Sequence, residues 1–233
     1  MATYVTSDIH GCYSKYIQIY DKIDFKDEDL LFVLGDVVDR GPEPMKVLKD
    51  MMTRPNVIPL IGNHEVLALA CLKCLVSEIT SENISRLSSD MMELLLEWID
   101  DGGQSTIEDF ARLSRSDRRD ILDYLGEFSL YDILTINGKG YLLVHGGLEN
   151  FSPDRLLEEY SPEEMVFSRP DYSKIYLPGV YLVTGHTPTR LIKENPQPDC
   201  IYRANNHIAI DCGCVFGGKL AVFRLDDWQE FYI

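Results

Sequence analysis

The chain has 233 residues, of which 22 are Lys or Arg and 38 are Asp or Glu, giving a formal net charge of −16. Such an acidic chain lacks the basic surface that displaces counterions from long nucleic acids, and it disfavours binding to an anionic membrane. Hydrophobic residues make up 45% of the chain, which is typical of a globular protein and unlike a disordered one. The length is sufficient for a buried core, and we expect residues 1–233 to form a single domain.

The start of the chain and its cysteines predict a cytoplasmic protein. The first charged residue is Asp8, and no apolar run of signal-peptide length precedes it. The most apolar helical stretch, over 66–75, is interrupted by Lys73 and is far shorter than the ~20 residues of a membrane-spanning helix. Six cysteines in a chain of this length do not indicate a disulfide framework, and the pair Cys71 and Cys74 is expected in a helix core.

Short apolar runs with strand character recur along the chain, and nearly every one leads into a polar cluster. In an open α/β sheet, ligands bind at the loops beyond the carboxyl ends of the strands. We therefore expect six strand ends to converge on one rim, with a closing strand over 219–225. The runs cover 3–7, 30–34, 57–61, 141–144, 181–184 and 208–210, and the clusters after them begin at Asp8, Gly35, Gly62, His145, Gly185 and Asp211.

The segment over 66–130, between the third and fourth of these strands, has a helical pattern and is expected to form a cap. Apolar residues at helical spacing over 90–101 stop at Gly102-Gly103. Ser105 to Glu108 resembles a capping box that opens a second helix, and 116–125 is a third candidate. Further along, Ser152-Pro153-Asp154 and Ser161-Pro162-Glu163 both have the pattern of a helix start.

The polar clusters contain residue types that bind divalent metal ions. Asp8 and His10 are two apart at the end of a strand, so they point to the same side and could hold one cation. Asp36 could bridge two ions through its two carboxylate oxygens, and Asn63 offers an amide oxygen. With two further imidazoles from His145 and His186, these nitrogen and oxygen ligands favour Mn, Fe or Zn in a site for two ions.

Three of the motifs together resemble a known family. Asp8-Ile-His10-Gly, Gly35-Asp36-Val-Val-Asp39-Arg40-Gly41 and Gly62-Asn63-His64-Glu65 are similar to the signature motifs of the calcineurin-like metallophosphoesterases, more narrowly of their phosphoprotein-phosphatase branch. His145-Gly-Gly, Gly185-His186-Thr-Pro and Trp98…Gly102-Gly103…Thr106 continue the pattern, so the resemblance runs from about residue 4 to 220. It implies an α/β fold, a four-layer α/β/β/α sandwich around two divalent ions.

The resemblance also implies roles for single residues. One metal ion would be held by Asp8, His10 and Asp36, and the other by Asp36, Asn63, His145 and His186. A hydroxide that bridges the two ions would attack the phosphorus directly and in line. His64 would be the general acid, oriented by Asp39, and Arg40 and Asn63 would contact the phosphate. Arg169 is the best match for a second phosphate-binding arginine. Manganese is the ion that we expect first, with Fe and Zn as alternatives.

The resemblance leaves the substrate open. A metal-dependent phosphomonoesterase of the serine/threonine type, acting on a phosphorylated protein or a small phosphoester, is the first hypothesis. A symmetrical bis(5'-nucleosyl)-tetraphosphatase is the second, although the sequence shows no obvious extra basic cluster for four phosphates. A phosphodiesterase for small cyclic nucleotides and a catalytically silent interaction module are further alternatives. We expect His207 to be structural, Asp211 to support the site without binding metal, and Cys12 to pack.

Overall fold

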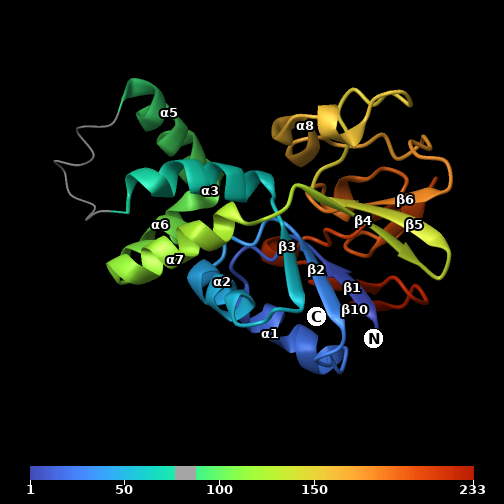
Figure 1. Cartoon of the computed structure of the whole chain (residues 1–233), viewed down its shortest axis with the longest axis horizontal. Coiled ribbons are helices and arrows are strands. Elements are labelled where there is room, and N and C mark those ends of the chain that lie inside the picture. Colours follow the sequence, from blue (N-terminus) through green and yellow to red (C-terminus); the bar gives the residue numbers. More distant parts are fainter. Residues whose placement is uncertain (77–87) are drawn as a thin grey trace.

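The computed structural model describes residues 1–76 and 88–233. Within these residues the strands form two five-stranded sheets, which lie face to face (Figure 1). The strand order is β10-β9-β1-β2-β3 in the first sheet and β4-β5-β6-β8-β7 in the second. Three neighbouring strands of each sheet are parallel; antiparallel strands add to one side of them in the first sheet and to both sides in the second.

The first sheet contains the first three predicted strands. β1 (Thr3–Thr6), β2 (Leu30–Leu34) and β3 (Val57–Leu60) run parallel, with Thr3 opposite Leu30 and Leu31 opposite Val57. The predicted closing strand is β9 (Ala221–Arg224), which pairs antiparallel with β1. The short β10 (Glu230–Tyr232), which the sequence pattern did not predict, completes this edge of the sheet.

The second sheet contains the other three predicted strands. β5 (Lys139–Val144), β6 (Val180–Thr184) and β8 (His207–Ala209) are parallel neighbours. β4 (Tyr131–Ile136) and β7 (Tyr202–Ala204) pair antiparallel at the two edges and were missed by the sequence analysis. An edge strand is only partly buried, so its apolar pattern is weaker than that of a central strand.

Three layers of apolar packing confirm the predicted α/β/β/α sandwich. Helices α1 (Tyr13–Lys22) and α2 (Pro44–Met52) pack on the outer face of the first sheet. Val5 and Phe32 of the first sheet and Leu143 and Val183 of the second meet between the sheets. In the described residues, the outer face of the second sheet carries the short α8 (Pro162–Val166), a 3-10 turn over Leu157–Glu159 and irregular chain, packed around Leu142, Val144 and Leu182.

The remaining helices lie beside the sheets (Figure 1). They are α3 (Asn63–Cys74), α5 (Ser89–Trp98), α6 (Gln104–Ala111) and α7 (Arg115–Gly126), with a wide helical turn over 99–103 joining α5 to α6. They account for the predicted helical segment over 66–130, of which 77–87 lies outside the described residues. No helix in the described parts of the chain is long and apolar enough to cross a membrane.

The predicted helix start at 152–154 is wrong, and the helix predicted to begin at Ser105 is present but lacks the predicted cap. Ser105 lies inside α6 and donates to the Gly102 carbonyl, because the preceding helical turn continues directly into α6 and leaves no place for a cap. Residues 152–154 form a turn, whereas Ser161 caps α8 as predicted. All six cysteines are free thiols; Cys71 is buried in the helix core as expected, but Cys74 is exposed.

Candidate active site

Loops that follow the six predicted strands line one pocket of about 620 Å³. Most of the predicted site residues lie in this pocket or directly behind its wall, and apolar side chains border it on one side. The residues that line it are Asp8, Asp36, Arg40, Asn63, His64, Asp101, Phe167, Arg169, His186, Pro188, Arg190, Leu191, Asp211 and Phe216.

Left-handed backbone at the ends of the strands aims the site residues. Asp8, His10, Asp36, Asp39 and His186 all have positive φ angles, between 45° and 71°. Few residues with a Cβ adopt this conformation, and it costs of order 1–3 kcal/mol each, so such residues concentrate at functional sites. Hydrogen bonds between the first two loops offset the cost: the Asp8 amide donates to the Gly35 carbonyl at 3.1 Å, and the His10 amide donates to the Asp36 carbonyl at 2.8 Å.

The buried Glu65 carboxylate holds the loop after β2 in place. It accepts hydrogen bonds from the amides of Asp36 at 2.7 Å, Val37 at 2.8 Å and Val38 at 3.1 Å, and from the Gly62 amide at 2.9 Å. Burial raises the pKa of this carboxyl above its usual value. The sequence analysis gave Glu65 no role, although its position in the first turn of a helix was a signal for interaction with backbone amides.

Asp36 lies at the centre of the possible metal ligands. One group of ligand atoms within 4.8 Å of one another comes from Asp36, His145 and His186. Asn63 adjoins this group, since its Oδ1 lies 2.9 Å from His145 Nε2. In His145, Nδ1 lies 2.6 Å from the Leu34 carbonyl, which can only accept, so this nitrogen carries the proton. Nε2 faces Asn63 Oδ1 and, at 3.3 Å, Asp36 Oδ1, so it is the nitrogen that would bind a metal ion after releasing its proton; burial lowers the pKa of this ring, but Asp36 outweighs it and raises the pKa to about 10.

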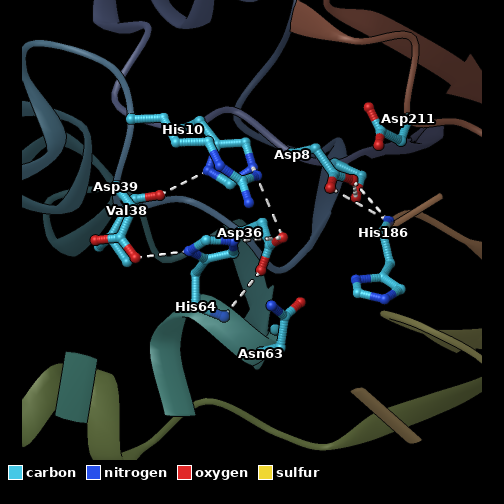
Figure 2. Close-up of polar contacts among 12 residues, drawn as sticks. Asp8, His10, Asp36, Val38, Asp39, Asn63, His64, His186 and Asp211 are labelled. Carbon is cyan, nitrogen blue, oxygen red and sulfur yellow. Dashed lines mark hydrogen bonds and ion pairs between the residues drawn. The ribbon is translucent and has the colours of Figure 1, made fainter. Parts of the chain in front are cut away.

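A second group contains Asp36, His10 and His64. His10 has the same arrangement as His145, because its Nδ1 donates to the Val38 carbonyl at 2.8 Å and leaves Nε2 as the acceptor. The sequence analysis grouped Asp8 with these residues instead of His64. The Asp8 carboxylate lies on the other side of Asp36, where it accepts the His186 amide at 3.1 and 3.2 Å (Figure 2).

Burial and close charges shift the pKa values of these groups. Burial raises the pKa of Asp8, and nearby Asp211 and Asp36 raise it further. Burial also lowers the pKa of His10 to about 3. For Asp36, burial favours the neutral form, but the surrounding histidines outweigh it and hold the pKa of this carboxyl well below its usual value. His10 is therefore neutral and Asp36 ionised at neutral pH, as binding of a metal ion requires.

His64 lies beside the metal ligands and is held by a series of buried hydrogen bonds, which we call the relay. Its Nδ1 lies 2.6 Å from Asp39 Oδ2, and its Nε2 lies 3.9 Å from Asp36 Oδ2. The Asp39 carboxylate also accepts the Trp98 indole N–H at 2.7 Å and the Thr106 hydroxyl at 2.5 Å. Burial lowers the pKa of the His64 ring, but Asp36 and Asp39 outweigh it and raise the pKa above its usual value. Trp98 and Thr106, from the cap helices, thus fix the carboxylate that orients His64.

Three arginines reach the pocket. Arg40 donates from Nη2 to Asp101 Oδ1 at 2.8 Å and from Nη1 to His10 Nε2 at 2.7 Å. Arg169, the predicted second arginine, lines the pocket and donates to the Thr187 hydroxyl at 3.1 Å. Arg190 was missed because no motif marks it, although it follows the Gly185-to-Pro188 cluster by only two residues.

The sequence predicts that Asp211 supports the site and that His207 is structural, and the structure gives the position of both. Asp211 lines the pocket, is largely buried and accepts the Gly213 amide at 2.9 Å; burial raises its pKa to about 6. His207 is buried away from the pocket, with Nε2 2.8 Å from the Lys174 carbonyl. Asp101, which the sequence analysis did not single out, contacts both Arg40 and, at 3.5 Å, His64 Nε2.

Comparison with known protein families shows which family the chain belongs to. The family model for calcineurin-like phosphoesterases matches residues 1–221, which is nearly the whole chain. The chain belongs to this family. A catalytically silent interaction module is thereby disfavoured, and the protein is a metal-dependent hydrolase of phosphoesters.

Relatives of this calcineurin-like phosphoesterase include tetraphosphatases that it matches along their length. The asymmetrical bis(5'-nucleosyl)-tetraphosphatase PrpE of Geobacillus sp. (strain WCH70) is 27% identical over 98% of this chain and 92% of that protein. The symmetrical enzyme of Chromobacterium violaceum is 24% identical over 99% of this chain and 94% of that protein. The structure of a protein serine/threonine phosphatase from Saccharomyces cerevisiae aligns with a TM-score of 0.60 over 97% of this chain and 73% of its own, at 12% identity, which shows the shared fold alone.

Proposed function

We propose that this phosphoesterase hydrolyses a dinucleoside polyphosphate, cutting within the phosphate chain. The observation that carries the proposal is the set of three arginines, Arg40, Arg169 and Arg190, that line the pocket of the metal ligands. A guanidinium binds two phosphate oxygens at once through its planar fork of N–H groups. Three arginines and two divalent ions together offer more positive charge and more hydrogen-bond donors than a single phosphoryl group can use. A chain of phosphates could use all of them.

The arginines retain hydrogen-bonding capacity for a substrate. Each guanidinium has five N–H donors. In the described part of the chain, the Arg169 side chain donates only through Nη1, to Thr187 and to the His186 carbonyl. Arg190 is held from behind by Asp199, which accepts from Nε at 2.5 Å. This carboxylate fixes the guanidinium without occupying its whole fork, which favours a role in binding an anion.

The proposed roles of the other residues are those that the family resemblance implies. One ion would be held by Asp8, His10 and Asp36, with His64 close by, and the other by Asp36, Asn63, His145 and His186. Two divalent ions supply an activated water molecule and offset the charge on the phosphoryl oxygens. His64, whose raised pKa favours the protonated form, would pass its proton to the leaving phosphate oxygen while Asp39 stabilises the ring. Manganese as the ion and the cytoplasm as the location remain predictions from the sequence.

The first hypothesis from the sequence, a serine/threonine phosphomonoesterase, is now the second candidate. The same metal ligands and the same proton donor would serve it. It ranked first because the sequence showed no extra basic cluster, and Arg190 weakens that argument. The named relatives that match along their whole length further support the tetraphosphatase reading.

A direct comparison of substrates tests the proposal. Manganese-loaded protein is given diadenosine tetraphosphate or a panel of phosphoserine and phosphothreonine peptides at matched concentrations, and the products are separated by ion-exchange chromatography. We expect the dinucleotide to be preferred. Two ADP molecules would identify symmetrical cleavage, and ATP with AMP would identify asymmetrical cleavage. A preference for the phosphopeptides would contradict the proposal.

Replacing arginines tests the observation on which the proposal depends. Arg190→Ala should lower kcat/KM for diadenosine tetraphosphate about tenfold or more, because a charge-assisted hydrogen bond contributes ~1.5–3 kcal/mol. The effect on p-nitrophenyl phosphate, which has one phosphate, should be smaller. Arg203→Ala is the matched control, since Arg203 pairs with Glu230 and does not line the pocket. Equal losses for both substrates would assign Arg190 a general structural role.

A further inference from the structure

A second cavity of about 530 Å³ adjoins the metal pocket. The two share Phe167 and Arg169 as a common wall, and no other lining residue belongs to both. Leu148 and Phe151 also line this cavity and follow shortly after the proposed metal ligand His145 in the chain. We call this cavity the distal pocket; it continues the metal pocket past Arg169.

The distal pocket has a flat aromatic wall. The rings of Phe151 and Tyr176 stack with centroids 4.9 Å apart and planes only 4° from parallel. The Tyr176 hydroxyl accepts the Asp171 amide at 2.9 Å, and the Tyr176 ring meets the His207 ring edge to face at 5.2 Å. These contacts hold the wall rigid, so that a planar ligand would bind without first ordering it.

Apolar side chains at the mouth of the distal pocket are exposed to solvent. Phe167 is 43% exposed and Ile175 is 55% exposed. Lys174 is at the mouth as well, paired with Asp171 at 2.9 Å. Exposed apolar groups that surround a cavity and stand beside cationic groups are typical of a ligand site. The combination suits a ligand with a planar ring at one end and phosphate at the other.

From this arrangement we propose that the distal pocket is the subsite for one nucleobase of the dinucleoside polyphosphate. The inference rests on the proposed function. The phosphate chain extends from the metal pocket past Arg169, and the base then enters between Phe167, Ile175 and the aromatic wall of Phe151 and Tyr176. The pocket thereby determines specificity, because it distinguishes a substrate that carries a base from a small phosphoester.

Two variants test the subsite, with a matched control. Ile175→Ser changes a side chain that lines only the distal pocket. Phe167→Ala removes an aromatic side chain that lines both the distal pocket and the metal pocket. Ile133→Ser is the control, because Ile133 on β4 is similarly exposed, at 59%, and lines neither pocket. KM and kcat are measured for diadenosine tetraphosphate and for p-nitrophenyl phosphate.

We expect both distal-pocket variants to raise KM for diadenosine tetraphosphate five- to tenfold, as the loss of base contacts would. Ile175→Ser should leave kcat for that substrate, and both constants for p-nitrophenyl phosphate, within about twofold. An unchanged KM for the dinucleotide in both variants overturns the subsite while leaving the proposed function intact. A raised KM for a phosphopeptide alone assigns the pocket to a peptide and also overturns it. If the wild-type protein cleaves p-nitrophenyl phosphate but not the dinucleotide, the proposed function fails and the subsite with it.

Discussion

Asp39→Asn tests the relay that supports His64. The carboxylate accepts hydrogen bonds from His64 at 2.6 Å, Trp98 at 2.7 Å and Thr106 at 2.5 Å, and it is fully buried. An amide in its place has one oxygen and one NH₂ group, so its NH₂ must face at least one of these donors. The variant also removes the negative charge that stabilises a protonated His64.

The structure allows the size of the effect to be worked out. A buried hydrogen bond to a charged group contributes ~1.5–3 kcal/mol, and about 1.36 kcal/mol corresponds to one pKa unit. The pKa of His64, raised in the wild-type protein by Asp36 and Asp39, should therefore fall by about one to two units. Because a general acid works only when protonated, activity on the alkaline side should be lost at a pH lower by the same amount, and kcat at neutral pH should fall about tenfold or more.

The assay is kcat against pH with phenyl phosphate and p-nitrophenyl phosphate. Phenolate leaves poorly without a proton, whereas p-nitrophenolate leaves readily, so the loss should be larger for phenyl phosphate. His64→Asn should reduce turnover while retaining metal, and adding Asp39→Asn to it should have little further effect, because both changes act on one proton transfer. An unchanged pH profile in Asp39→Asn, or full additivity in the double variant, would refute the relay.

Three further variants test the framework of the site. Glu65→Gln removes the charge that four backbone amides share, and a loss of ~2 kcal/mol should lower Tm by about 4–8 °C in a calorimetric scan; an unchanged Tm would contradict this. Gly102→Ala should reduce activity, because a Cβ would lie 2.6 Å from Arg40 Cγ, whereas Gly138→Ala, also at positive φ but with no neighbour within 4 Å, should leave kcat unchanged. Asp36→Asn removes the central carboxylate of both ligand groups, so elemental analysis should find less bound metal than in wild-type protein.

The central strands and the order of the site loops were predictable because local sequence determines them. A buried parallel strand is a continuous apolar run, and each of the six predicted runs corresponds to a strand, from β1 to β8. The loops that follow must turn sharply, so they concentrate Gly and Asp in patterns that can be recognised without knowledge of the fold. Partly buried edge strands such as β4 and β7 carry no such signal.

Residues that act through long-range contacts could not be predicted in the same way. Arg190 reaches the pocket because Asp199 holds its guanidinium and because Gly213 leaves room beside it, with a Cβ there 3.1 Å from Arg190 Nη2. Neither contact leaves a pattern near Arg190 in the sequence. The place of Asp8 was also hard to foresee: two-residue spacing puts it on the same side as His10 only in extended backbone, but both residues have positive φ.

The charge of the pocket indicates the order in which ligands bind. Four aspartates, three arginines and His64 line it, so without divalent ions its charges nearly cancel and, within a chain of net charge −16, it would bind a polyphosphate only weakly. Two divalent ions would add four positive charges, which offset the four carboxylates and leave the arginines to make the pocket positive. Affinity for a non-hydrolysable dinucleotide should therefore depend on prior metal binding, whereas Arg40, Arg169 and Arg190 on their own should hold it only weakly. The net charge of −16 should then weaken the binding of long nucleic acids more than that of a short phosphate chain.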